Sequence, residues 1–472
     1  MNIKALNLIK NFSYTFISNL ISMSVSILIV LILPKVLGVE EYGYFQLFVF
    51  YASYVGFLHF GWSDGIYLRY GGLHYKELNY RLLNNQFIML VLSQLFISII
   101  IVTVSSFLLD DKDRLYIIKM IALLVVIVNS RYILIHIFQA SNRIREFAKI
   151  TLLEKVIFIF SVTLFILFDM VGFKFFIISD VIGKLISLIV AIYFCKDIIF
   201  NTLKNFHFNI RETIQNINAG YKLMFANIAG MLIIGVVRFG VERTWDIATF
   251  AKVSLTLSIS NFLMIFITAI GIIIFPILKR IDQDKLPEVY NVIRHLLGAS
   301  LLLILIFYYP IKIALMYWLP NYKESLIFMV LVFPMVVFEG KTALLINTYL
   351  KALRKERLML MVNAISLLFS VLLTVIFTVG LKNLELAILS FLIALVFKSI
   401  FSEVLLAKCL KIKVTKDIIL EIYMVSLFII SSWFLNTWTA FVFYGLVYIF
   451  YLLVKRNEIS KSINKIKTLA RN

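Results

Sequence analysis

One feature constrains this chain more than any other, the repetition of apolar runs long enough to cross a lipid bilayer. The first, residues 12–33, has no charged side chain; as a helix it would be about 33 Å long, against a bilayer core of about 30 Å. The sequence therefore predicts an all-α polytopic membrane protein of about 14 transmembrane helices. The expected spans are residues 12–33, 44–63, 86–109, 115–139, 150–168, 173–195, 219–237, 249–278, 292–309, 325–349, 358–379, 384–407, 417–435 and 437–454.

Composition agrees with a membrane protein and excludes a soluble one. Hydrophobic residues make up 62% of the chain and charged residues only 15%, and the mean hydropathy is +0.97, whereas a soluble domain needs a polar exterior. The net charge of +20 does not predict a nucleic-acid partner, because basic residues accumulate in the cytoplasmic loops of membrane proteins. The two cysteines, Cys195 and Cys409, imply no disulfide framework.

The distribution of Lys and Arg predicts the orientation. Alternate loops carry many more basic residues than the loops between them, which places both termini in the cytoplasm and agrees with an even number of helices. No cleavable signal peptide is expected, since the first apolar run is too long and no small-residue cleavage site follows it.

An internal repeat indicates how the spans are grouped. The basic loop QASNRIREFAK at residues 139–149 recurs 212 residues later as KALRKERLMLM at residues 351–361, with Arg143 aligned on Lys355. The loops follow spans four and ten, so the repeating unit has six spans and enters the membrane the same way each time. The predicted divisions are a six-helix lobe at 1–195, a cytoplasmic amphipathic linker at 196–219, a second six-helix lobe at 220–407, an additional helix pair at 408–454 and a basic cytoplasmic tail at 455–472.

Motifs for catalysis or metal binding are missing from the sequence. We find no Walker loop, no Gly-rich dinucleotide turn and no His/Cys/carboxylate cluster at metal-ligand spacing. The five histidines, His59, His74, His136, His207 and His295, stand apart in the sequence, and each is interpreted as an interfacial or packed side chain. We therefore expect a protein that is not an enzyme and that needs no cofactor or metal.

Polar side chains within the apolar spans are the remaining candidates for function. Asn19 and Ser22 in span one and Asn261 in span eight fit either helix packing through small polar residues or the wall of a hydrated cavity.

Four cations within spans carry the main hypothesis about the site. Arg131, Lys184, Lys341 and Lys398 would each cost about 2.5–3.5 kcal/mol if exposed to lipid at the bilayer centre. We expect them to line a cationic central cavity and to bind an anionic substrate. Asp180 lies four residues before Lys184 and could neutralise it, while Glu339 is expected to be free to titrate or to bind a coupling ion; both acids are candidates for ion coupling.

Several motifs, in this order and spacing, resemble one transporter family. PKVLGVEEYG follows the first span, FGWSDG the second, the 139–149 loop the fourth, FPILKR the eighth, and YWLPNYKES lies in the longest outer loop. Together they resemble the Wzx-type polysaccharide-unit flippases of the multidrug/oligosaccharidyl-lipid/polysaccharide (MOP) superfamily, over most of residues 10–410. Span one lacks the cations that the branch of this superfamily specific for peptidoglycan precursors carries there, which favours a surface-polysaccharide repeat unit.

The resemblance implies a two-lobed, MATE-like transporter that works by alternating access. It would move an undecaprenyl-pyrophosphate-linked oligosaccharide, of the O-antigen or capsule type, to the outer leaflet of the bacterial cytoplasmic membrane, driven by a proton or sodium gradient. Expected partners are this substrate, membrane lipids and the polysaccharide polymerase and chain-length machinery, with the flippase itself a monomer. A MATE-type drug/cation antiporter and an integral-membrane glycan polymerase or transferase remain alternatives. The helix pair at 417–454 would form an apolar groove for the lipid tail or serve only in packing.

Overall fold

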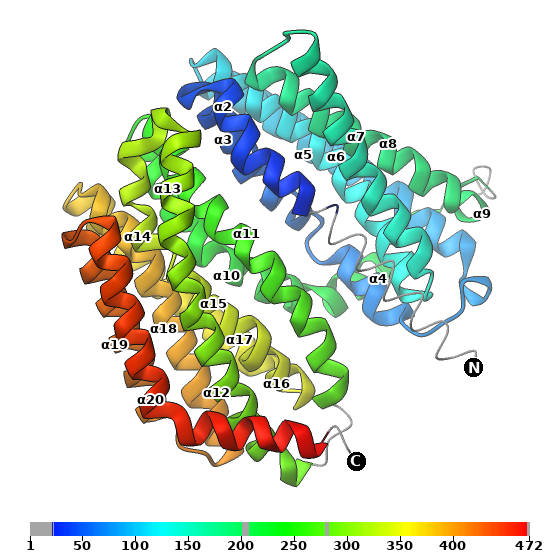
Figure 1. Cartoon of the computed structure of the whole chain (residues 1–472). Helices are drawn as coiled ribbons and strands as arrows, with labels where there is room; N and C mark the ends of the chain where they lie inside the picture. The colour runs from blue at the N-terminus through cyan, green and yellow to red at the C-terminus, as the bar shows by residue number, and fades with distance from the viewer. Residues whose placement is uncertain (1–20, 22, 201–206, 279–282, 470–472) are drawn as a thin grey trace. The chain divides into compact units, whose positions relative to one another are not determined.

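A computed structural model describes residue 21 and residues 23–200, 207–278 and 283–469. This part of the chain consists of helices joined by short turns and contains no strand, as the apolar runs predict (Figure 1). Twelve of its helices are long and apolar enough to cross a membrane. They coincide with the third to fourteenth predicted spans.

The first two predicted spans appear differently. Only part of span one lies in the described residues, where Met23–Leu37 forms a shorter apolar helix. Span two is the 17-residue helix α3 (Val39–Val55), which continues through the 3₁₀ turn η2 (Gly56–His59) into α4 (Trp62–Tyr70). The described part of the chain therefore shows twelve of the predicted spans, and the number of about 14 stays a prediction.

The chain forms two compact units, residues 1–228 and 229–472, and the boundary falls inside one helix. In unit 1 the long helix α6 lies at the centre and packs against the helices before and after it. The unit contains α2 (Leu33–Leu37), α3, α4, α5 (Tyr80–Leu108), α6 (Lys112–Ala140), α7 (Ile144–Leu167), α8 (Phe173–Phe194), α9 (Lys196–Ile199) and the first part of α10 (Ile210–Thr244).

Unit 2 repeats this arrangement and adds a helical hairpin. The span 329–352 is buried along nearly all of its length, like α6 in unit 1. The unit contains α11 (Ile247–Leu278), α12 (Leu286–Ile304), α13 (Tyr308–Trp318), α14 (Met329–Val332), α15 (Met335–Lys341), the π-helical turn η8 (Thr342–Ile346), α16 (Asn347–Ala352), α17 (Glu356–Thr374), α18 (Leu384–Leu410), and the hairpin of α19 (Thr415–Phe434) and α20 (Thr437–Leu469). The hairpin packs on α12.

The two basic loops of the predicted internal repeat form the same backbone turn. In unit 1 the loop after α6 turns at Asn142, whose φ is 58°, and in unit 2 the loop after α16 turns at Arg354, whose φ is 54°. The next amide reaches back to the carbonyl five residues earlier in both, Arg143 to Phe138 and Lys355 to Leu350, each at 2.8 Å. Two sequences with few identical residues therefore build one turn.

The predicted linker at 196–219 is wrong in its second half. Residues 210–219 are the first turns of α10, which runs on without interruption to Thr244. This part of α10 is held against α4 of unit 1, because Gly65 and Gly220 let the two backbones approach so closely that a Cβ on Gly65 would lie 1.7 Å from the carbonyl oxygen of Asn216. Arg69 adds an ion pair to Glu212 at 2.6 Å.

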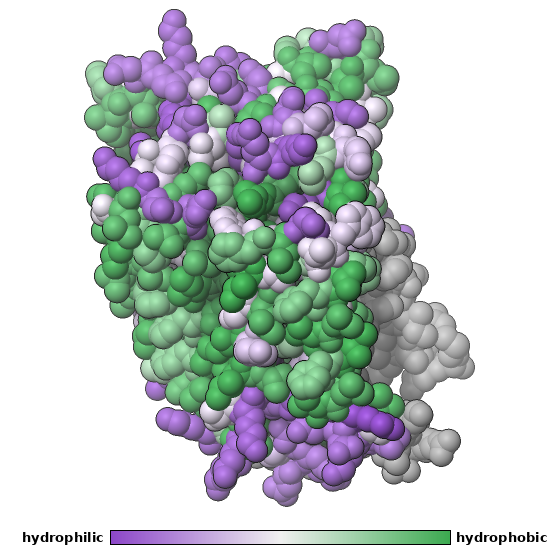
Figure 2. Space-filling model, turned by 60° about the vertical axis from the view of Figure 1, so that its left-hand side comes forward, coloured by the Kyte–Doolittle hydropathy of each residue, from purple (hydrophilic) through white to green (hydrophobic). Residues whose placement is uncertain are grey.

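Hydrophobic side chains also cover the outside of the helices. Figure 2 shows them gathered in a broad band between hydrophilic margins. On α19 and α20 this band includes strongly exposed aromatic side chains, among them Tyr423, Phe434, Trp438 and Phe450. A surface of this kind is stable against lipid and not against water, so the chain is a multi-pass membrane protein.

Candidate functional site

Unit 1 contains a cavity of about 310 Å³, within the range of ligand pockets. One part of its wall is apolar and aromatic, and the other part is charged. The lining residues are Val25, Ile29, Phe45, Phe48, Val49, Ala52, Ser53, Glu154, Lys155, Phe158, Asp180 and Lys184. Such a cavity can hold a ligand that has both apolar and charged groups.

The charged part of this wall is a chain of ion pairs from α6, α7 and α8. Arg131 of α6 contacts Glu154 of α7 and also donates to Ser187 of α8 at 3.1 Å. The second oxygen of Glu154 lies 3.7 Å from Lys184, which also contacts Asp180 one helical turn earlier. Asp180 thus neutralises Lys184 locally, one of the two roles considered for it.

Arg131 itself does not line the cavity. Its side chain is 7% exposed and lies behind Glu154, so it positions that carboxylate. The lysines that reach the cavity are Lys155 and Lys184. Counted with Arg131, the cluster has three cations and the two acids Glu154 and Asp180, and therefore a formal charge of +1.

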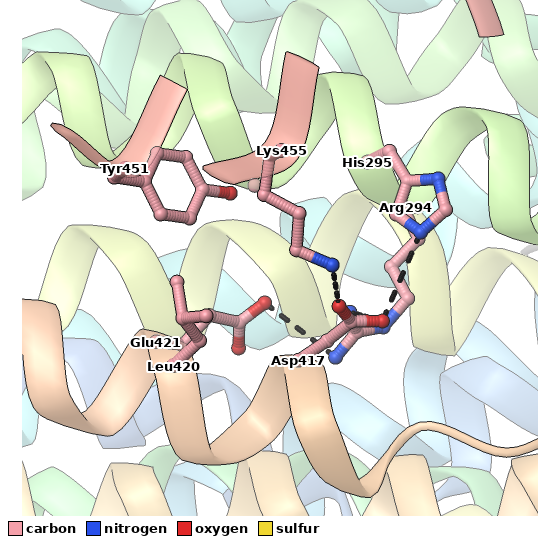
Figure 3. Close-up of a pocket in the computed structure, with 8 residues that line it drawn as sticks. Arg294, His295, Asp417, Leu420, Glu421, Tyr451 and Lys455 are labelled. Atoms are coloured by element: carbon pink, nitrogen blue, oxygen red, sulfur yellow. Dashed lines mark hydrogen bonds and ion pairs between the residues drawn. The ribbon is translucent and has the colours of Figure 1, made fainter. Parts of the chain in front are cut away.

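Unit 2 holds a larger buried network of charges, with the hairpin as part of it. Lys341 of α15 contacts Glu403 of α18 at 2.7 Å and also Glu421 of α19. Arg294 of α12 contacts Glu403 at 2.5 Å and Asp417 of α19 at 2.7 Å. Figure 3 shows Asp417 between Arg294 and Lys455 of α20. The space enclosed there, about 10 Å³, holds no more than about one water.

His295, Asp417 and Glu458 bring metal-ligand atoms within 4.8 Å of one another in this network. However, Lys455 contacts both Asp417 and Glu458. Its ammonium group already lies against both carboxylates that a metal ion would need, and Arg294 also pairs with Asp417. The cluster is therefore explained as part of the ion-pair network that ties the hairpin to α12.

The four predicted cations do not form an unneutralised surface, which corrects the expected cationic cavity. Lys398 pairs with Glu339 at 3.1 Å, and Arg131, Lys184 and Lys341 pair as described above, each within its own unit. Glu339 is likewise not free, contrary to expectation. The physical reason is the cost of an isolated buried charge, which a carboxylate from a neighbouring helix removes.

The predicted polar residues of the spans have mixed outcomes. Asn19 and Ser22 lie outside the described residues. Asn261 lies on α11 with an exposed side chain. In the same helix, buried Ser254 accepts a hydrogen bond from Arg238 of α10 at 3.1 Å. That contact fits helix packing, one of the two roles considered for such residues.

Sequence reasoning missed the acids that partner the cations. Glu154, Glu403 and Glu421 each lie within an apolar helix, and an acid in such a helix is itself a signal for a buried partner. The interpretation of each histidine as an interfacial or packed side chain also did not reveal its acidic neighbours: His59 and His136 both lie near Asp64, and His295 belongs to the unit 2 network.

The fold is similar to that of solved structures of a flippase and of membrane transporters. A lipid II flippase MurJ in an inward closed conformation matches with a TM-score of 0.56 and 14% identity, over 95% of this chain and 99% of that chain. A multidrug-resistance MATE transporter of the MOP superfamily, facing inward, matches with a TM-score of 0.58 and 12% identity, over 84% of this chain and 95% of that chain.

A third structure is a MOP superfamily transporter from Pyrococcus furiosus whose binding pocket has reversed polarity. It matches with a TM-score of 0.53 and 14% identity, over 86% of this chain and 97% of that chain. No protein-family model and no curated protein matches the chain. At these identities the comparisons show the fold alone.

Proposed function

We propose that this protein is a flippase that moves an undecaprenyl-pyrophosphate-linked oligosaccharide from the inner to the outer leaflet of a bacterial cytoplasmic membrane. The observation that carries the proposal is the match with MurJ over nearly the full length of both chains. The MATE transporter covers 84% of this chain and the Pyrococcus furiosus transporter 86%. The proposed substrate class is therefore that of a flippase, with a surface-polysaccharide repeat unit in place of lipid II.

The unit 1 cavity supports an anionic substrate that carries sugars. Lys184 and Lys155 would attract a pyrophosphate or an acidic sugar, and the attraction is stronger in a partly dehydrated cavity than in water. Phe45, Phe48 and Phe158 offer apolar surface to the faces of sugar rings. Arg131 would act indirectly, by holding Glu154 in place beside Lys184. In unit 2, the main role of Lys341 and Lys398 would be to form ion pairs with neighbouring acids.

The direct test uses purified protein in liposomes that contain a lipid-linked oligosaccharide with a fluorescent sugar. A membrane-impermeant quencher added outside should reach more of the label when the flippase is present. Lys184→Gln should slow this movement, while Lys174→Gln, at an exposed position on the same helix, should not. Movement no faster than in empty liposomes would contradict the proposal.

A MATE-type antiporter is the second candidate, and the acids Glu154 and Asp180 on the cavity wall favour it, because they would suit a cationic drug. Uptake of an organic cation against a proton or sodium gradient in the same liposomes discriminates the two. A polymerase would instead lengthen the oligosaccharide, which chromatography of the recovered lipid detects.

A further inference from the structure

Three titratable side chains from separate segments meet in unit 1, away from the cavity. His59 ends η2, Asp64 lies in α4 and His136 lies near the end of α6. His59 Nε2 is 3.8 Å from Asp64 Oδ2, and His136 Nε2 is 4.0 Å from Asp64 Oδ1. His59 is 4% exposed, Asp64 14% and His136 19%, so the cluster is enclosed but reachable by protons.

The hydrogen bonds of the two imidazoles define their tautomers. The amide of Gly61 donates to His59 Nδ1 at 3.0 Å, so Nδ1 of neutral His59 carries no proton and Nε2 carries it. His136 Nδ1 lies 2.7 Å from the carbonyl oxygen of Tyr132. Since a carbonyl only accepts, this Nδ1 carries the proton and Nε2 of neutral His136 presents a lone pair.

Asp64 consequently faces a donor on one side and an acceptor on the other. Its Oδ2 faces the N–H of His59, a favourable arrangement for a carboxylate. Its Oδ1 faces the lone pair of His136, and two acceptors repel each other unless a proton lies between them. One proton, on either Oδ1 or Nε2, converts this repulsion into a hydrogen bond after a small side-chain rotation or through one bridging water.

We infer that Asp64 and His136 form a binding site for a single exchangeable proton, with His59 as the residue that orients the carboxylate. The surroundings are consistent with this assignment. Burial raises the pKa of Asp64 to about 6, and among the described residues the two histidines are the only basic groups within 4 Å of its carboxylate.

The other titratable groups nearby have different partners. Arg69 of α4 is engaged by Glu212 and Asn216 of α10, and Tyr70 also donates to Glu212. The rings of Tyr67 and Tyr132 contact His136 edge to face. Lys222 of α10 lies over the ring of Tyr221. The proton is therefore shared by Asp64 and His136 rather than governed by a neighbouring ion pair.

The position of the site gives the proton a mechanical role. Asp64 stands next to Gly65, and its Cβ would be 2.9 Å from a Cβ at Gly220 of α10. A change in charge at Asp64 thus acts on the close contact between α4 and α10. The coupling of this site to transport rests on the proposed function. The binding of a proton by Asp64 and His136 does not depend on that function.

The test is an infrared pH titration of the purified full-length protein between pH 5 and 8. Among its transitions the wild type should show one near pH 6 that belongs to this site, seen as a carboxyl or imidazolium band. Asp64→Asn and His136→Gln should each remove it, and the double variant should remove no more than either single one, because one proton is shared. His74→Gln, an exposed histidine, is the matched control and should leave it unchanged.

Additive effects of Asp64→Asn and His136→Gln, or titrations identical to the wild type, would overturn the inference. His59→Gln keeps both proton-binding groups, Asp64 and His136. This variant should shift the transition without abolishing it. In liposomes, a pH gradient should accelerate transport by the wild type and not by Asp64→Asn. If the protein moves no lipid-linked oligosaccharide at all, the infrared result still decides the proton site.

Discussion

Lys341 Nζ of α15 donates to Glu403 of α18 at 2.7 Å, and the same ammonium group contacts Glu421 of α19. These three side chains are at most 5% exposed, so a single lysine joins two helices of the six-span repeat to the C-terminal hairpin. Arg294 contacts the same two acids from α12. The hairpin is therefore bound to unit 2 by buried charges as well as by apolar packing.

Replacing Lys341 with Ala should destabilise the protein strongly. It leaves Glu403 and Glu421 with only Arg294 as counter-charge, and breaking a buried pair costs about 3–5 kcal/mol. Thermal unfolding in detergent should show a clearly lower unfolding temperature than that of the wild type. Lys398→Ala is the matched control and should cost less, because its partner Glu339 is 25% exposed. Equal losses in both variants would contradict this role of burial.

The turn at Asn142 predicts a different response to two substitutions. The left-handed conformation costs a residue with a Cβ about 1–2 kcal/mol. The cost is smaller for Asn, and Gly, which has no Cβ, avoids it. Asn142→Val should therefore lower the unfolding temperature, and Asn142→Gly should leave it nearly unchanged. The same pair of substitutions at Arg354 should give the same order, and the reverse order at either site would exclude a backbone origin.

The contact between α4 and α10 predicts that Gly65→Ala is severely destabilising. The new methyl group would lie 1.7 Å from a backbone oxygen of α10, which cannot move without separating the helices. Gly445→Ala is the control, since a Cβ there meets nothing within 4 Å and should add about 1 kcal/mol of helix propensity. The yield of monodisperse purified protein is the measurement that compares the two variants.

Asp246 should make a small, pH-dependent contribution to stability from outside the spans. It caps α11 by accepting from the amide of Thr249 at 2.8 Å, and hydrogen bonds from the side chain and the amide of Thr249 lower the pKa of its carboxyl below the usual value. Because the pKa is lowered in the folded state, the stabilisation is present at neutral pH and is lost as the pH falls through that pKa. Asp246→Ala should cost about 1 kcal/mol at pH 7 and less in acid.

The sequence predicted the helices better than the site, for a physical reason. Length and hydropathy define a membrane span locally, so every span from α5 onward was located, although α10 and α20 extend well beyond their predicted ends. The repeat was visible because the turns at Asn142 and Arg354 need the same short basic loops. Which acid meets Arg131 or Lys341 depends on helix packing between residues 23 to 80 positions apart, and no local pattern encodes that.

The histidines illustrate the same limit. His59 and His136 are far apart in sequence and lack any metal-like spacing, yet the packing of η2 against α6 brings them to one carboxylate. Buried amides hold that contact: Asn129 donates to the carbonyl of Val55 at 3.1 Å, and Gln94 to that of Leu58 at 3.2 Å. Such amides in an apolar helix are the signal that could have indicated a structured polar region.

The sequence distance between ion-pair partners also bears on how the two units are made. Arg131 meets Glu154 only 23 residues later, so unit 1 can neutralise its cation while the next helix is still being inserted. Lys341 must wait 62 residues for Glu403 and 80 for Glu421. During synthesis α15 thus enters the bilayer region with an uncompensated charge, at a cost of about 2.5–3.5 kcal/mol. The folding of unit 2 should consequently be completed only after the ribosome has synthesised α19. Chains that end before α19 should be recognised by quality-control proteases.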